Sequence, residues 1–164
     1  MSDGSTAWFA LVDGAADPEI APLATGCRDQ ACLLSGRLAP DLAAASPYLA
    51  KVDPHEALLH VWQERGVGQA WGMLIESELS LMELRKLLRS FLQAKLPDGE
   101  VVMFRFYDPR VFRGYLPTAS AEQRAAWFKG VRQYVVEAAD GGQHSFRWRG
   151  GQLVDGDRPV PLTA

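Results

Sequence analysis

The sequence predicts an α/β fold: a single domain whose mixed, partly parallel central sheet is flanked by helices and followed by a C-terminal antiparallel β meander. Three observations support this prediction. The chain has 164 residues, 48% of them hydrophobic, which suits one domain with its own core. Over the first 108 residues, apolar runs alternate with helix signals, as in sheets with some parallel pairs. Beyond residue 131, Gly-Gly pairs separate short β-type runs. We therefore expect an α/β core over residues 1–131 and a β-rich extension of the same domain over residues 132–164.

The first half of the chain contains strand and helix signals in turn. Two Asp-Pro pairs, at residues 17–18 and 53–54, favour helix starts, because Asp caps a helix and Pro suits its first position. These helices are expected to end near Gly26 and Gly66, since glycine commonly follows a helix. Strands are predicted from the apolar runs at residues 7–13, 31–36, 47–53 and 68–77.

The clearest helix covers residues 80–96, where Ser80 and Glu83 form a capping box and apolar residues follow at helical spacing. A Pro-Asp-Gly turn ends it, and residues 100–108 predict the strongest strand. Ser120 is expected to cap a further helix. Two or three short strands follow in the tail, with turns at the two Gly-Gly pairs.

Composition and charge limit the class of protein. The net charge of −3 disfavours general nucleic-acid binding, and no apolar run is long enough to span a bilayer. The start of the chain lacks a basic, apolar leader, and the two cysteines match neither a zinc site nor a secreted disulfide framework. We therefore expect a cytoplasmic protein. Residues 104–149 carry eight basic and four acidic side chains, a local charge of +4 that could face an acidic partner or simply be a solvated surface.

Three aspartates end predicted strands: Asp13, Asp53 and Asp108. In an open α/β sheet, such carboxylates could meet, hold Mg²⁺ and serve a phosphohydrolase. The alternative is local: Asp53 and Asp108 precede proline and Asp13 precedes glycine, which capping and turn formation explain. We favour the local explanation and keep the hydrolase as the alternative function.

Other catalytic signals are weak. His55 and His60 are five residues apart, so a helix would place them on different faces. The sequence has no nucleophile elbow, phosphate-binding loop or dinucleotide-binding motif. We therefore expect a protein that is not an enzyme and needs no metal or cofactor.

Arginines and aromatic residues favour a protein-binding role, because both are frequent anchors in interfaces. A polar cluster at residues 105–110 ends the strongest predicted strand. In the tail, the two arginines of residues 146–149 share one strand face and the two aromatic residues the other; packing of those aromatics into the core is an equally good explanation. The candidate binding residues are Arg105, Tyr107, Asp108, Arg110, Arg113, Trp71, Arg147, Trp148 and Arg149.

Several segments together resemble one family. They are "WFALVDGA", "SPYLAKVD", "GQAWGMLIES", the run from "LRKLLRSF" through "LPDGEVVMFRFYDPRVFRGYLPT", and "AAWFKGV". Together they resemble the domain of unknown function 4123 family over residues 8–131, and the combination of "LPDG", "FRFYDPRV" and "LPT" is the specific part.

The resemblance implies an adaptor or chaperone of bacterial type VI secretion. Such a protein would bind a cognate toxic effector and help to load it onto the VgrG or PAAR spike, without catalysis. The partners expected are therefore the effector and, as a second candidate, a VgrG or PAAR spike protein, with no nucleic acid and no membrane. The tail beyond residue 131 matches no pattern of the family and is where we expect specialisation for one cargo. Self-association through the tail is a further alternative.

Overall fold

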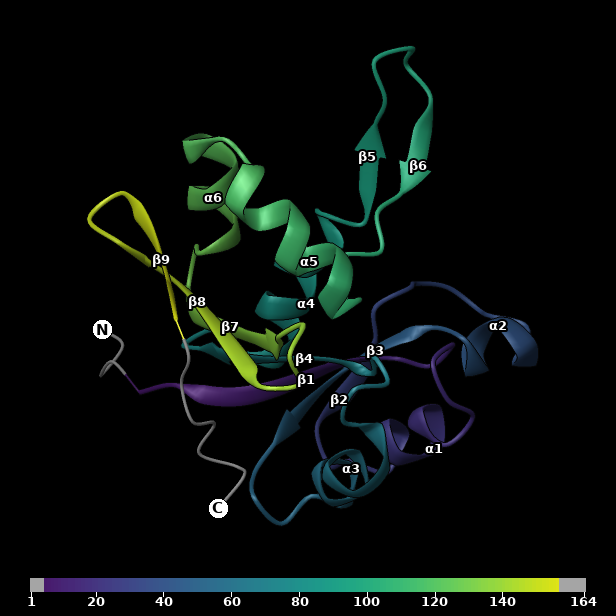
Figure 1. The fold of residues 1–164 in the computed structure, drawn as a ribbon. Helices are drawn as coiled ribbons and strands as arrows, with labels where there is room; N and C mark the ends of the chain where they lie inside the picture. The colour runs from purple at the N-terminus through teal and green to yellow at the C-terminus, as the bar shows by residue number, and fades with distance from the viewer. Residues whose placement is uncertain (1–4, 157–164) are drawn as a thin grey trace.

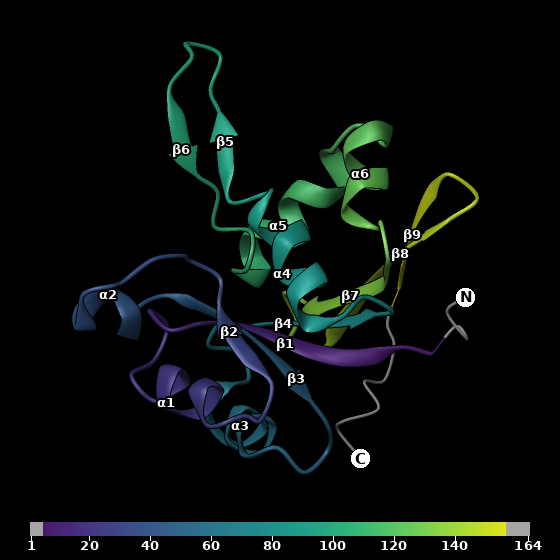
Figure 2. The ribbon, with the colours of Figure 1, turned by 180° about the vertical axis from the view of Figure 1, so that it is seen from behind.

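The computed structural model describes residues 5–156, which form a seven-stranded sheet with helices on both faces and a separate two-stranded hairpin (Figures 1 and 2). The strands of the large sheet are β1 (Ala7–Asp13), β2 (Gln30–Cys32), β3 (Pro47–Val52), β4 (Gly72–Ser77), β7 (Val131–Glu137), β8 (Gln143–Arg149) and β9 (Gln152–Gly156). The hairpin strands are β5 (Gln93–Lys95) and β6 (Val101–Met103).

The large sheet has the strand order β2-β3-β1-β4-β7-β8-β9, and every neighbouring pair is antiparallel. The prediction of a partly parallel sheet is therefore wrong. The reason lies in the strand order. β3 and β4 run in the same direction and are joined through helical turns, as in a parallel crossover, but β1 lies between them and runs the opposite way. The alternation of strands and helices is present, yet it produces no adjacent parallel pair.

Helices cover the two faces of the sheet differently (Figures 1 and 2). α4, α5 and α6 lie on one face, and α1 and α3 lie on the other. The helical bounds are α1 (Ile20–Thr25), α2 (Pro40–Ala44), α3 (Ala57–Val61) continued by the π-helical turn Trp62–Gly66, α4 (Leu81–Arg89), α5 (Pro109–Tyr115) continued by the 3-10 turn Leu116–Thr118, and α6 (Ala121–Trp127). No helix within residues 5–156 is both long and apolar enough to cross a membrane.

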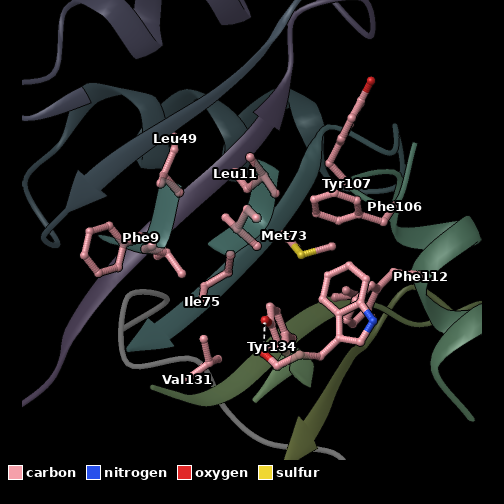
Figure 3. Close-up of a cluster of buried hydrophobic side chains, with 14 of the residues drawn as sticks. Phe9, Leu11, Leu49, Met73, Ile75, Phe106, Tyr107, Phe112, Val131 and Tyr134 are labelled. Carbon is pink, nitrogen blue, oxygen red and sulfur yellow. Dashed lines mark hydrogen bonds between the residues drawn. The ribbon is translucent and has the colours of Figure 1, made fainter. Parts of the chain in front are cut away.

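Each face of the sheet has its own hydrophobic core. Figure 3 shows part of the larger core, in which Leu11 of β1 and Met73 of β4 gather with Phe106, Phe112 and Tyr134. Side chains alternate between the two faces of a strand, so the neighbouring residues of β1 and β4 enter the smaller core under α1 and α3. The sheet is therefore buried on both faces around its central strands.

Two of the expected helix starts are confirmed. Ser80 and Glu83 form a capping box at α4, and Ser120 and Gln123 form a second one at α6. Asp53 differs from the prediction: its Oδ1 atom accepts a hydrogen bond from the backbone N–H of His55, and α3 begins later, at Ala57. This aspartate shapes a turn before the helix and does not cap it.

Residues 80–108 depart most from the prediction. The helix expected over residues 80–96 stops at Arg89, and the strand expected over residues 100–108 is paired only at Val101–Met103. The following segment leaves the hairpin because two consecutive residues, Phe106 and Tyr107, are both buried in the larger core. An alternating strand cannot bury two neighbours on one side. α5 then begins at Pro109, where only a turn was expected.

The tail forms the predicted antiparallel meander, with turns at Gly141 and at Gly150-Gly151. Its first strand, β7, begins at the expected boundary near residue 131 and pairs with β4 inside the large sheet. Residues 157–164 of the expected extension lie outside the described residues.

Candidate protein-binding surface

The Asp13 side chain, at the end of β1, is the buried centre of a corner between the sheet and the segment after β6. Its Oδ2 atom lies 3.1 Å from Nη2 of Arg105, and its Oδ1 atom accepts a hydrogen bond from the backbone N–H of Ala15 at 2.9 Å. Only 9% of the Asp13 side chain is exposed, against 55% of that of Arg105. The guanidinium thus covers the carboxylate from the solvent side and ties the segment after β6 to a central strand.

Tyr107 extends this corner towards the core. Its ring is buried, the guanidinium carbon of Arg105 lies 5.9 Å from the ring centroid, and the hydroxyl points away from the core cluster (Figure 3). Burial raises the pKa of Tyr107, while Arg105 acts in the opposite direction. The interaction with Tyr107, followed by that with Asp13, raises the pKa of Arg105. At neutral pH, the corner therefore holds a neutral phenol beside a cation.

Asp108 and Arg110 form a second, local pair at the start of α5. Asp108 caps the helix by accepting a hydrogen bond from the backbone N–H of Arg110 at 2.9 Å. Its two carboxylate oxygens also accept hydrogen bonds from Nε and Nη2 of Arg110, at 3.0 and 2.7 Å. Burial alone would raise the pKa of Asp108, but the hydrogen bonds from Arg110 more than offset it, so that pKa is lowered. The charged groups of residues 105–110 are thus held in pairs, Arg105 with Asp13 and Arg110 with Asp108.

The three strand-end aspartates do not all converge: Asp13 and Asp108 both influence the pKa of Tyr107, but Asp53 lies elsewhere. β3 runs antiparallel to β1 with Trp8 opposite Val52 and Asp13 opposite Pro47, so Asp53 follows the end of β3 that lies far from Asp13. The two carboxylates are separated by about six strand positions, or roughly 20 Å. Residues 5–156 contain no group of three or more His, Cys, Asp or Glu side chains that could hold a metal ion. The magnesium hypothesis therefore lacks its set of ligands.

Two further candidates have structural roles. The guanidinium of Arg113 on α5 donates a hydrogen bond to the backbone carbonyl of Glu137, at the end of β7. Trp71 is buried, and its ring lies against Gly66, where a Cβ atom would come within 2.5 Å of it. Trp71 is therefore unavailable to a partner, and Arg113 connects α5 to the sheet.

The tail candidates lie on β8, which is not an edge strand because β7 and β9 pair with its two sides. As predicted, the aromatic residues share one face: Phe146 is buried, and Trp148 stacks against Phe128 at a centroid distance of 6.2 Å. Arg147 and Arg149 share the opposite face, where Arg147 reaches Oε1 of Gln133 at 3.4 Å. The aromatic side chains of this strand thus belong to the core, and its arginines remain the accessible part.

The sequence did not predict the β5–β6 hairpin, which carries three exposed large apolar side chains of the described residues. We call residues 93–103 the arm; Figures 1 and 2 show that it projects from the body of the protein. Val101 is 57% exposed and Met103 is 48% exposed, and Leu96 near the tip is exposed as well. Grooves lie on both sides of the base of the arm.

A local signal for the arm was present in the sequence. The loop Pro97-Asp98-Gly99 joins the two strands, and Gly99 has a φ of +90°. A three-residue loop that ends in a left-handed glycine is a common hairpin connection. The helical pattern that runs through residue 96 concealed this hairpin.

Comparison with known proteins adds one finding. The model of the family described as a domain of unknown function, DUF4123, matches residues 8–126 of this chain, which has 164 residues. No curated protein and no solved structure matches it. The matched region contains Asp13, Asp108 and the whole arm, and ends within α6. The chain therefore belongs to the domain of unknown function 4123 family.

Proposed function

We propose that this protein is a non-enzymatic adaptor of type VI secretion. It would bind a cognate effector in the cytoplasm and help to load that effector onto the VgrG or PAAR spike. Membership of the domain of unknown function 4123 family supports this proposal, together with the resemblance of residues 8–131 to its adaptor members. Cofactors have no role in it.

The exposed arm is the observation that carries the proposal. Two-stranded hairpins are only marginally stable on their own in water, and exposed apolar side chains on such a hairpin gain by contact with another protein. Val101 and Met103 are large apolar residues on the same face of β6, and both are exposed. A protein whose task is to hold another protein would present a surface of this kind.

The corner at the base of the arm favours a structural role for its charged residues over a catalytic one. Asp13 is held by Arg105 and Ala15, and Asp108 is held by Arg110. The Asp13–Arg105 pair ties the segment after β6 to β1, and the Asp108–Arg110 pair fixes the start of α5. They favour a rigid mount for a binding surface over a reaction centre.

Co-purification tests the proposal. The tagged chain is co-expressed with the product of the neighbouring gene, which the proposal takes to be the cognate toxin, and we expect this toxin to be captured. Met103→Asp on the arm should reduce capture strongly, because an aspartate in an apolar interface must lose its hydration. Met82→Asp is the matched control, since Met82 is 58% exposed and lies on α4, away from the arm. A wild-type chain that fails to capture the toxin would refute the adaptor role.

Secretion gives a second readout. Deletion of the gene should stop delivery of that toxin while other cargo of the same apparatus is still delivered. Loss of all secretion, or of none, would contradict an adaptor with one cognate effector.

A further inference from the structure

We infer that the cargo binds by adding an extended segment as a third strand along the free edge of β6. This inference rests on the adaptor function proposed above and names the surface and the form of the bound segment. β6 lies in a two-stranded sheet with β5 as its neighbour, so one of its sides faces away from any strand in residues 5–156. Adding a strand to such an edge is a common mode of peptide recognition.

The pattern of hydrogen bonds between β5 and β6 shows which backbone groups are free to pair with an added strand. The N–H of Phe104 donates to the carbonyl of Leu92, and the N–H of Leu96 donates to the carbonyl of Glu100. Hydrogen-bonded and non-hydrogen-bonded pairs alternate along an antiparallel ladder. The pairs Gln93–Met103 and Lys95–Val101 are therefore non-hydrogen-bonded pairs. The backbone N–H and C=O groups of Val101 and Met103 consequently point outward, along the free edge of β6.

The two edges of the arm differ in chemistry, and this difference selects β6. The β5 edge carries Gln93 and Lys95, and a lysine on an edge strand discourages further pairing. The β6 edge has the sequence Val-Val-Met, without charge, proline or glycine. Exposed β edges of this composition are favourable templates for another strand, so β6 is the edge that a partner segment would extend.

A groove beside β6 provides space and charge for the side chains of that segment. It has a volume of about 570 Å³ and is lined by all three residues of β6 and Gln93 of β5, by Arg89 and Leu92, and by Leu33 to Ser35 with Leu38 from the segment after β2. The guanidinium of Arg89 donates to Oγ of Ser35 at 2.8 Å. Among residues 5–156, no carboxylate lies within 4.0 Å of that guanidinium. The segment that fits is therefore extended, apolar at alternate positions, and acidic where it passes Arg89.

A pair of proline substitutions separates the two edges. Val101→Pro removes an outward N–H on β6, and Lys95→Pro removes the outward N–H directly opposite on β5. Neither change breaks a β5–β6 hydrogen bond, so both variants should fold as the wild type does. With the product of the neighbouring gene, taken as the cognate toxin, as the probe, we expect Val101→Pro to weaken binding at least about tenfold and Lys95→Pro to leave it unchanged. Equal binding by the two variants would overturn the inference.

A charge reversal tests the acidic character of the segment. Arg89→Glu should weaken binding of the same toxin about tenfold, because a glutamate would repel the acidic residue of the segment. Lys86→Glu is the control: it makes the same charge change on the same helix, at an exposed residue outside the groove lining. Equal losses in both variants would show only a general effect of net charge and would overturn the acidic specificity.

Amide exchange on the complete chain gives a direct readout. On addition of the toxin, the amides of Val101 and Met103 should become protected from exchange with solvent, while that of Lys95 should not. Capture of the toxin without this protection would overturn strand addition and leave the adaptor function standing. Protection without toxin, together with a dimer in light scattering, would identify a second copy of this chain as the occupant and overturn the inference. Failure to capture the toxin at all would refute the adaptor function itself.

Discussion

Asp13 and Arg105 are 92 residues apart in the chain, and their side chains meet at 3.1 Å between the end of β1 and the segment that leads out of the arm. The carboxylate is buried and also accepts a hydrogen bond from the backbone of Ala15. This contact joins a central strand of the sheet to the base of its most projecting element.

The Asp13–Arg105 pair is expected to stabilise the fold. Arg105→Gln should lower the free energy of unfolding by about 1 kcal/mol, because it leaves a buried carboxylate without its cation while solvent still reaches the site. Asp13→Asn should have a similar effect. Urea unfolding of both single variants and the double variant measures their coupling, which we expect to be at least about 0.5 kcal/mol. Purely additive losses would show that the two side chains do not interact.

The Asp108–Arg110 pair predicts a pH dependence. The pKa of Asp108 is lowered in the folded protein, so its stabilising contribution is fully present above the ordinary value of 3.8 and is lost as the pH falls through the lower, folded value. Asp108→Asn keeps a capping residue and removes the charge. It should be less stable than the wild type at pH 7, and the difference should shrink as the pH falls below 3.8 and through the lower, folded value. Urea titrations at neutral pH and over a series of acidic pH values measure this difference; a difference that does not shrink in acid would contradict the lowered pKa.

Cys27 is expected to be unreactive in the native protein. Burial, followed by the charge of nearby Glu56, raises the pKa of the Cys27 thiol to about 12. At pH 8 the reactive thiolate is therefore about one part in ten thousand. Alkylation followed by peptide mass spectrometry should show slow labelling of Cys27 in the folded chain and fast labelling in urea. Cys32 is more exposed and is the internal comparison. Equal labelling of both cysteines in the folded chain would contradict the predicted protection.

Two glycine substitutions should have opposite effects. A Cβ atom at Gly72 of β4 would lie 2.0 Å from the carbonyl oxygen of Leu11, so Gly72→Ala should destabilise the central sheet by at least about 3 kcal/mol. A Cβ atom at Gly114 of α5 meets nothing within 4 Å, so Gly114→Ala should stabilise the helix by about 0.5–1 kcal/mol. Thermal unfolding of the two variants compares these effects. Destabilisation of the chain by Gly114→Ala would contradict the open space seen at that position.

The sequence predicted those features that depend on neighbouring residues. The capping box at Ser80, the helix cap at Ser120 and the glycine turns of the tail are local, because the groups that satisfy each other lie within a few positions. The strand order could not be obtained in this way. The position of β1 between β3 and β4 depends on packing across the whole sheet. It makes the sheet antiparallel throughout, although strands and helices alternate along the chain as they do in proteins with parallel sheets.

The candidate surface was predicted only in part. Residues 105–110 do form a compact polar corner, but the partners of Arg105 and Arg113 come from β1 and β7, and no local pattern indicates them. The arm escaped prediction because the helical spacing of apolar residues continues past Arg89 as far as Leu96. The helix ends at Arg89, and residues 93–95 pair with residues 101–103 instead of continuing it. The local sequence is compatible with both structures, so contacts with the rest of the chain decide between them.

The closure of the arm at the Leu92–Phe104 pair has an evolutionary consequence. The strand residues beyond this pair, 93–95 and 101–103, take no part in the ladder of the large sheet, so their identity can change while the scaffold and the "LPDG" turn stay the same. Selection on what the protein recognises can therefore act on a short, nearly independent module, without compromising the stability of the domain that carries it. We therefore expect homologous chains that share the scaffold and the "LPDG" turn but differ along the two strands of the arm.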